Sequence, residues 1–170
     1  MFNSEDFLEV LYSWAKENGL ITNNYLKTDN GFPEKKEDLL KAETLYLNWK
    51  KNDNSEFNEL PKEIANLKNL VHLTITTNHL EKLPKELGEL NKLEFLDLYD
   101  NKLSEIPKEI FKITSLKRLT LSNNNIKRLP IEIINCKELV EFVYDGNNYI
   151  YFNLEQKKWL EELKRNNFHI

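Results

Sequence analysis

The chain has 170 residues, with 24 Lys and Arg against 28 Asp and Glu, so its formal net charge is -4 at pH 7. This balance disfavours a nucleic acid or an anionic membrane as the partner, because both attract basic surfaces. The acidic start MFNSEDFLEV does not resemble a secretory signal, and no stretch approaches the ~20 apolar residues that cross a bilayer. The single cysteine, Cys136, fits a reducing compartment, so we expect a cytoplasmic protein.

The first expected element is a helix with Ser4 as its N-cap and Gly19 just past its end, since these residue types favour those positions. One side of this helix is apolar, which suits a cap over the end of a larger core. The apolar residues are Phe7, Leu8, Leu11, Trp14 and Ala15. Residues 1–41 are therefore assigned to an N-terminal helical cap and a degenerate lead-in that contains Phe32-Pro33.

A weak repeat follows, with Leu45 and Leu47 as the inward residues of a short strand. The next Leu-Pro step, Leu60-Pro61, comes late, so residues 50–56 are interpreted as an insertion. A polar surface loop of this kind is either merely tolerated or forms a binding edge beside Trp49, and the sequence leaves both interpretations open.

Three clear repeats and the beginning of a fourth come next, because Leu70, Leu93, Leu116 and Leu139 are each 23 positions apart. The other apolar positions and one asparagine return at the same step. They are the strand residues Leu73/Ile75, Leu96/Leu98, Leu119/Leu121 and Phe142/Tyr144, then Asn78, Asn101, Asn124 and Asn147, then Leu80, Leu103, Ile126 and Tyr149. Since strand side chains alternate between faces, each L-x-L pair points inward from a short strand.

The remaining repeat positions also have physical roles. The asparagine amides can donate to and accept from the backbone of neighbouring coils, so we expect an asparagine ladder. Proline in each Leu-Pro step fixes φ, and two apolar residues three apart follow it, as one helical turn on the opposite side requires. Cys136 takes one of these inward positions, so we interpret it as a buried apolar residue.

The last expected element is a helix at the C-terminal end of the repeats. Asn153 with Gln156 three residues later forms a capping-box pattern. The apolar stripe of this helix is predicted to contain Leu154, Trp159, Leu160 and Leu163. We assign residues 153–170 to a C-terminal helical cap, because a solenoid must cover its end coils.

The units LVHLTITTNHLEKLPKELGELNK and LEFLDLYDNKLSEIPKEIFKITS resemble leucine-rich repeats. They are most similar to the intracellular 23-residue type with an LPxxI/LxxL segment, found in Ras-suppressor-like and Scribble-like scaffolds and in short bacterial repeat proteins. The resemblance covers roughly residues 42–152. It implies an α/β fold, a right-handed solenoid with a curved parallel sheet on the concave face and short helices or 3-10 turns on the convex face. It also implies binding of proteins or peptides, although members bind very different partners.

Candidate binding residues lie between the inward leucines, where side chains point out of the concave sheet. Aromatic residues and arginine are enriched in binding hot spots, and acidic residues outnumber basic ones here. The candidates are Tyr46, Trp49, His72, Phe95, Asp97, Tyr99 and Arg118, with Ser122 and Asp145 in the same outward rows and Thr77, Asp100, Asn123 and Gly146 at the strand ends. The alternative is that the rings only pack against their cross-strand neighbours.

The leading hypothesis is a non-catalytic, monomeric protein-interaction module, an adaptor or scaffold. Five strands about 4.8 Å apart and about 17 Å long expose only ~400 Å² in projection. A stable interface takes about 800 Å² from each side, so we expect a peptide, helix or loop as the bound segment. Neither a cofactor nor a metal is expected, since His72, His79 and His169 show no ligand spacing. The alternatives are a structural or self-associating protein, and a small ligand-binding protein or catalyst using His72, Asp97 and Tyr99.

Overall fold

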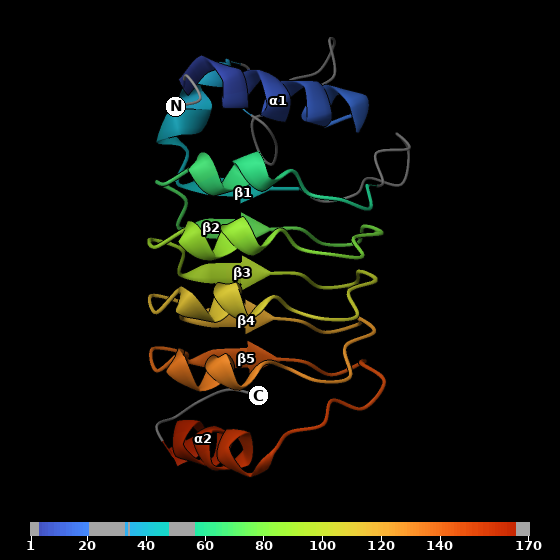
Figure 1. Cartoon of the computed structure of the whole chain (residues 1–170), viewed down its shortest axis with the longest axis vertical. Helices are drawn as coiled ribbons and strands as arrows, with labels where there is room; N and C mark the ends of the chain where they lie inside the picture. The colour runs from blue at the N-terminus through green and yellow to red at the C-terminus, as the bar shows by residue number, and fades with distance from the viewer. Residues whose placement is uncertain (1–3, 21–32, 34, 48–56, 166–170) are drawn as a thin grey trace.

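The computed structural model describes residues 4–20, 33, 35–47 and 57–165. Its strands form one five-stranded parallel sheet in the order β1-β2-β3-β4-β5. They are β1 Thr44–Tyr46, β2 His72–Thr74, β3 Phe95–Asp97, β4 Arg118–Thr120 and β5 Glu141–Val143. The 3-10 helices are η1 Lys36–Lys41, η2 Lys62–Asn66, η3 Lys85–Glu89, η4 Lys108–Lys112 and η5 Ile131–Asn135. Helices α1 (Ser4–Glu17) and α2 (Leu154–Arg165) lie at the two ends of the stack (Figure 1), so the predicted solenoid with helical ends is confirmed.

The register of the sheet follows the 23-residue step of the sequence. The inward residue of each strand pairs with its repeat equivalent on the next, and all of them are buried. These pairs are Leu45↔Leu73, Leu73↔Leu96, Leu96↔Leu119 and Leu119↔Phe142. Because strand side chains alternate, the residues beside them must point away from the core. The predicted sorting of inward and outward residues is confirmed for these strands.

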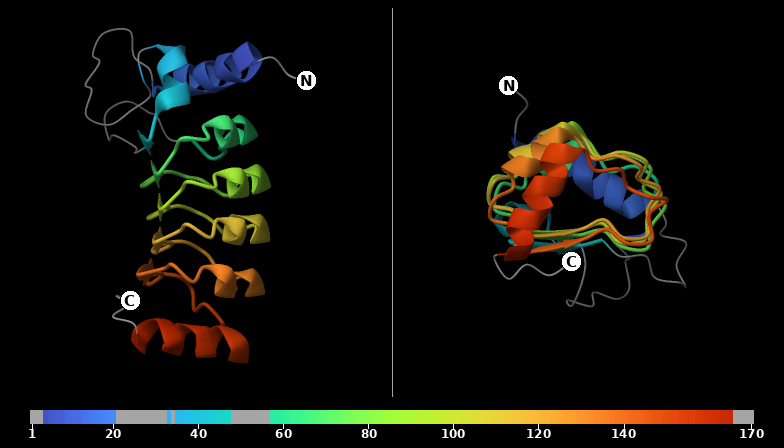
Figure 2. Two further views of the ribbon diagram at one scale, coloured as in Figure 1. Left: turned by 90° about the vertical axis from the view of Figure 1, so that its left-hand side faces the viewer. Right: turned by 90° about the horizontal axis from the view of Figure 1, so that it is seen from below.

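The strands lie along one side of the stack and the 3-10 helices η2–η5 along the opposite side (Figure 2). Each of these four helices has a proline at its N-cap, followed by two apolar residues that are fully buried. At η5 these residues are Ile133 and the C-cap residue Cys136, and burial raises the pKa of the Cys136 thiol to about 12. Cys136 is therefore a buried apolar residue, as predicted.

The predicted asparagine ladder is present. Asn101 Nδ2 donates to the Ile75 carbonyl of the preceding coil at 2.8 Å, and Asn101 Oδ1 accepts from the Leu80 N–H at 3.2 Å. Asn124 and Asn147 repeat both contacts one coil further along. Asn78 Nδ2 donates to Leu47 O at 2.8 Å, but its buried Oδ1 has no partner among the described residues.

Helix α1 ends in a Schellman motif at Gly19, whose φ is 67°. The N–H of Leu20 donates to Ala15 O at 2.8 Å, and the N–H of Gly19 donates to Lys16 O at 3.2 Å. The Trp14 ring packs edge-on against Phe57 at 5.0 Å and so joins α1 to the first complete coil. The start of α1 differs from the prediction, because Ser4 is its first helical residue rather than the cap before it.

Helix α2 begins with the predicted capping box. Asn153 Oδ1 accepts from the Gln156 N–H at 2.9 Å, and Gln156 Oε1 accepts from the Asn153 N–H at 3.0 Å. Gln156 Nε2 also donates to Leu129 O at 2.9 Å, which ties the cap to the last coil. Trp159 is buried, as are Leu160 and Leu163.

Two predicted apolar contacts are wrong. Leu154 is 69% exposed, because the buried side of α2 is set by Gln156, Trp159, Leu160 and Leu163, and position 154 falls on the opposite side. Tyr149 is 93% exposed, whereas Ile126 at the equivalent position is buried. A left-handed backbone at Tyr149, with φ 64°, turns its ring outward.

Some predictions lie outside the described residues, namely Trp49, Phe32 and the insertion at residues 50–56. Among the helices that the structure describes, none combines the length and the apolar character needed to span a membrane.

Candidate binding surface

The outward side chains of the five strands and of the residues just after them form an open surface, which we call the sheet face. It consists of Thr44, Tyr46, His72, Thr74, Thr76, Phe95, Asp97, Tyr99, Arg118, Thr120, Glu141, Val143 and Asp145. The structure brings all predicted binding residues together on this face except Trp49, which it does not describe.

A column of interacting side chains crosses the sheet face from β2 to β5. His72 packs against Phe95 with ring centroids 4.1 Å apart, and the Arg118 guanidinium lies 5.4 Å from the Phe95 ring centroid. Arg118 Nε is also 3.0 Å from Glu141 Oε2. These residues pair directly across neighbouring strands, so the register itself builds the column. Cross-strand packing therefore holds the half-buried Phe95 ring in one place.

Tyr99 is the most exposed aromatic side chain of the sheet face, at 41% exposure. Its hydroxyl accepts a hydrogen bond from Asn123 Nδ2 at 3.0 Å, which fixes the position of the ring. The hydroxyl proton remains able to donate to a bound partner. Tyr99 thus combines an oriented apolar surface with a free polar group, a combination typical of interface tyrosines.

Asp97 lies between Phe95 and Tyr99 along the chain, on the same side of the sheet. Partial burial raises the pKa of the Asp97 carboxyl above its usual value, and the nearby negative charge of Glu141 adds to that rise. The N–H of Tyr99, which donates to Asp97 Oδ1 at 3.0 Å, acts in the opposite direction and lowers the pKa. A cation placed here by a partner would therefore relieve an unfavourable charge.

Three other acidic groups of this region, those of Glu94, Glu141 and Asp145, already have partners. Glu94 Oε2 lies 2.8 Å from Lys117 Nζ, and Asp145 Oδ1 accepts from the Ser122 hydroxyl at 2.6 Å. Among the described residues, no ion pair involves Asp97 or Asp100. The contact with Asp145 also explains why Ser122 is buried at 3% exposure, although the sequence predicted it to point outward.

The strands β2 to β5 are each followed by a residue with a left-handed backbone, which turns the chain away from the sheet. These residues are Thr77, Asp100, Asn123 and Gly146, with φ between 55° and 69°. Asparagine, aspartate and glycine tolerate this conformation, but a β-branched threonine does not. The sequence placed these residues at strand ends without indicating the backbone conformation.

The three side chains considered for catalysis do not act on one another. His72 is stacked on Phe95, and the Asp97 carboxylate binds the backbone N–H of Tyr99. Within the described part of the chain, no three His, Cys, Asp or Glu side chains gather in a way that could hold a metal ion.

The parallel strands advance along one axis, and a 3-10 helix lies opposite the strand in each coil. Successive coils also share an asparagine at the same position. These features define a solenoid repeat protein. The family model for the leucine rich repeat matches residues 92–148. The fold is that of a leucine-rich-repeat solenoid. No curated protein sequence matches it.

The solved structures that are similar to the chain include the following three. A leucine-rich-repeat protein of Leptospira interrogans is 29% identical, with a TM-score of 0.50, over 74% of this chain and 37% of its own length. The ectodomain of the Arabidopsis thaliana receptor kinase GASSHO1/SCHENGEN3, in complex with CASPARIAN STRIP INTEGRITY FACTOR 2, is 33% identical, with a TM-score of 0.51, over 54% of this chain and 11% of that one. The SOBIR1 ectodomain, also from Arabidopsis thaliana, is 19% identical with a TM-score of 0.56 and covers 88% of this chain and 95% of its own, a likeness in fold alone. The chain thus spans less than half the length of the first two.

Proposed function

We propose that the chain is a non-catalytic adaptor that binds a peptide, helix or loop of a partner protein on its sheet face. The observation that carries this proposal is the pair of aromatic rings, Phe95 and Tyr99, held in fixed positions on either side of a carboxylate without a cation. Anchors that are already oriented lose little conformational entropy on binding. The chain would act as a monomer.

The arrangement on β3 suggests what the partner presents. Successive residues on one side of a strand are about 6.6 Å apart, and an extended segment has the same spacing along its own side chains. A segment with a basic side chain between two apolar ones matches the order Phe95, Asp97, Tyr99. The basic group would approach Asp97, and the apolar groups would cover the two rings.

The area of the sheet face supports a short bound segment, since ~400 Å² is about half of what a stable globular interface needs from one side. The similar receptor-kinase ectodomain is in complex with CASPARIAN STRIP INTEGRITY FACTOR 2, which supports a binding role for these repeats. A lone buried thiol, Cys136, supports a reducing compartment such as the cytoplasm.

The test is a pull-down from a lysate of the source organism with the wild-type chain and with the double variant Phe95→Ala/Tyr99→Ala. Truncation of two hot-spot rings, each worth about 2 kcal/mol, is expected to reduce capture of the specific partner by more than tenfold. The melting temperature should fall little, since the column around Phe95 contributes only about 1 kcal/mol to stability.

The matched control is Tyr149→Ala/Tyr151→Ala, which removes two exposed aromatic rings away from the sheet face. Capture by this control should equal that of wild type. Equal losses in both double variants, or unfolding of the Phe95/Tyr99 variant, would contradict the proposal.

A further inference from the structure

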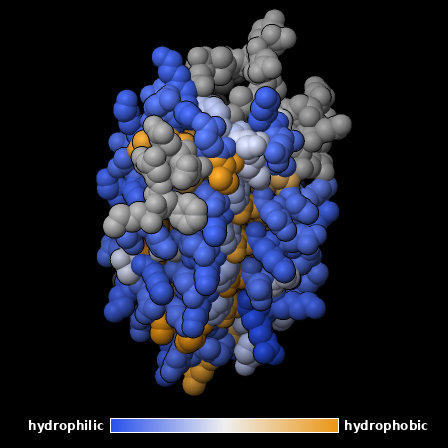
Figure 3. Space-filling view, turned by 45° about the horizontal axis from the view of Figure 1, so that its top comes forward, coloured by the Kyte–Doolittle hydropathy of each residue, from blue (hydrophilic) through white to orange (hydrophobic). Residues whose placement is uncertain are grey.

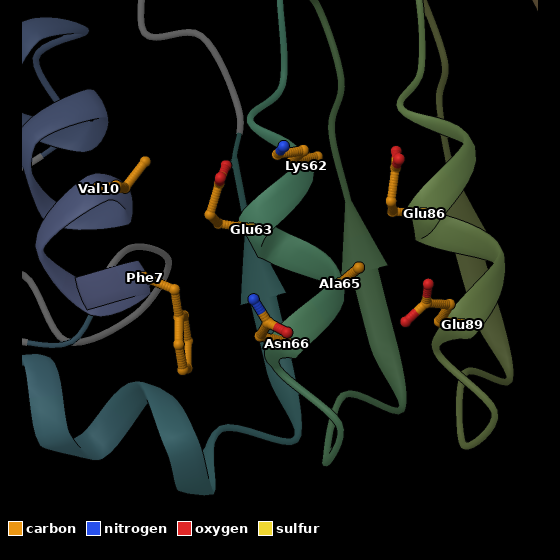
Figure 4. A pocket seen from close by; sticks show the side chains of 8 residues that line it. All are labelled: Phe7, Val10, Lys62, Glu63, Ala65, Asn66, Glu86 and Glu89. Carbon is orange, nitrogen blue, oxygen red and sulfur yellow. The ribbon is translucent and has the colours of Figure 1, made fainter. Parts of the chain in front are cut away.

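A second hollow surface lies on the side of the 3-10 helices, at the N-terminal end of the stack. It is a groove of about 400 Å³ between α1, η2 and η3, and Figure 4 shows the side chains that line it. Phe7 and Val10 come from one side of α1, and Ala65 comes from η2. The space-filling view from this side shows a narrow band of apolar side chains between hydrophilic flanks (Figure 3).

One residue that lines the groove, Ala65 of η2, is small for its repeat position. Ala65 and Gly88 occupy the position that holds Phe111 and Ile134 in the next two coils. Phe111 is completely buried in its coil, whereas Ala65 presents only a methyl group to the space beside α1, and Gly88 is packed against η4. Glycine is required at position 88, since a Cβ there would lie 2.1 Å from the Glu109 carbonyl oxygen.

The groove has an apolar floor and an acidic rim. Phe7 is half-buried and Val10 is 44% exposed, although both are apolar. Three carboxylates, those of Glu63, Glu86 and Glu89, line the rim against one cation, Lys62.

Glu89 lies 2.9 Å from Lys68, but no ion pair involves Glu63 or Glu86 in the part of the chain that the structure describes. Both of these side chains are half-buried, so their charges are only partly screened by water.

We propose that this groove docks a basic, amphipathic segment of a partner protein. The apolar side of that segment covers Phe7 and Val10, and its lysine or arginine side chains meet Glu63 and Glu86. The volume is within the range of about 300–1,000 Å³ at which proteins bind small ligands, so the groove accepts a few side chains rather than a whole domain.

This site is independent of the sheet face. The 3-10 helices lie on the opposite side of each coil from the strands, so the two surfaces face in different directions (Figure 2). A partner segment in the groove does not block a second segment on β3. The chain can therefore hold two partners at once, which is what an adaptor requires.

The test uses a synthetic amphipathic helix of leucine, alanine and lysine as the probe, and a counterpart with glutamate in place of each lysine. Binding to the full chain is followed by isothermal titration and by amide chemical shifts in NMR spectra. We expect the basic helix to bind and to shift signals of α1, η2 and η3, and the acidic helix not to bind. The double variant Glu63→Gln/Glu86→Gln should weaken binding of the basic helix roughly tenfold, since it removes two charge pairs.

The repeat supplies a matched control, because Glu109 and Glu132 occupy the same repeat position as Glu63 and Glu86 and are also half-buried. Glu109→Gln/Glu132→Gln should leave the affinity of the basic helix unchanged, and so should Phe95→Ala/Tyr99→Ala on the sheet face. The proposal would be overturned if the basic and acidic helices bound with equal affinity, or if the Glu109/Glu132 control lost as much affinity for the basic helix as the Glu63/Glu86 variant. It would also be overturned if the chemical shifts changed only on the sheet face. Concentration-dependent sedimentation that Val10→Asn abolishes would overturn it too, since the groove would then bind a second copy of the chain.

Discussion

The asparagine ladder is complete in the middle of the solenoid and incomplete at its N-terminal end. Asn101 satisfies the Ile75 carbonyl and the Leu80 N–H, whereas Asn78 makes the equivalent donor contact and leaves its Oδ1 without a described partner. Both side chains are buried. The same residue at the same repeat position therefore contributes differently, because each coil is stabilised only by its immediate neighbours.

The largest effect is expected where two middle coils approach most closely. Gly88→Ala places a Cβ 2.1 Å from the backbone oxygen of Glu109, and backbone cannot move aside as a side chain can. We expect a loss of about 3 kcal/mol in the free energy of unfolding, measured by urea denaturation. The reverse change at the same repeat position, Ala65→Gly, should cost only about 1 kcal/mol. If both variants lost a similar free energy of unfolding, the backbone of η4 would be able to move away from a Cβ at position 88.

The comparison between the two asparagines is tested by replacing each with alanine. Asn101→Ala leaves buried backbone groups unpaired on both sides and should cost about 2–3 kcal/mol. Asn78→Ala loses only donor contacts and should cost about 1 kcal/mol. Both free energies of unfolding come from denaturant titrations, and an equal cost at the two positions would remove the difference between the middle and the end of the ladder.

A smaller effect, a gain in the free energy of unfolding, is expected at Thr77. Among the residues with a left-handed backbone that follow the strands, Thr77 is the β-branched one. Thr77→Gly relieves the strain of φ 55° and should stabilise the protein by about 0.5–1 kcal/mol after the larger chain entropy of glycine is subtracted. Thr74→Gly, in the regular part of β2, should destabilise it instead. A lower melting temperature for both variants would mean that Thr77 makes contacts that outweigh its strain.

The smallest effect concerns the charge on the sheet face. Because the pKa of Asp97 is raised in the folded protein, the folded state binds its proton more tightly than the unfolded state does. As the pH rises from the pKa of Asp97 in the unfolded state to its pKa in the folded state, ionisation of this carboxyl therefore lowers the free energy of unfolding. The free energy of unfolding stays lower at every pH above that range. Asp97→Asn should be the more stable protein at neutral pH, and the difference should disappear in acid. Urea denaturation of both proteins across this pH range measures it, and a wild type that is more stable at neutral pH would contradict the expected sign.

The sequence predicted those parts of the fold that depend on the repeat alone. The 23-residue step places Leu73, Leu96 and Leu119 inward, and it therefore also places His72, Phe95 and Arg118 in one row across the sheet. Cross-strand packing of the rings was only an alternative at the level of sequence, since ring orientation depends on side-chain packing within the row. The sequence could not predict the groove, because the position of α1 relative to η2 follows no repeat.

The errors at the C-terminal end have a physical cause that was partly visible in the sequence. Leu154 lies two residues before Gln156, and on a helix this spacing places the two side chains on opposite sides. A helical projection would have shown this. The exposure of Tyr149 was harder to predict from the sequence. Its left-handed backbone arises where the last coil meets the C-terminal helix instead of a further coil.

The central claim, that the sheet face holds the partner, is tested most directly by hydroxyl-radical footprinting of the chain with and without the captured protein. We expect oxidation of Phe95 and Tyr99 to decrease in the complex, while Tyr149 and Tyr151, which are exposed elsewhere, remain as reactive as before. Protection of Tyr149 and Tyr151 with unchanged oxidation of Phe95 and Tyr99 would contradict the claim and place the binding site at the C-terminal end.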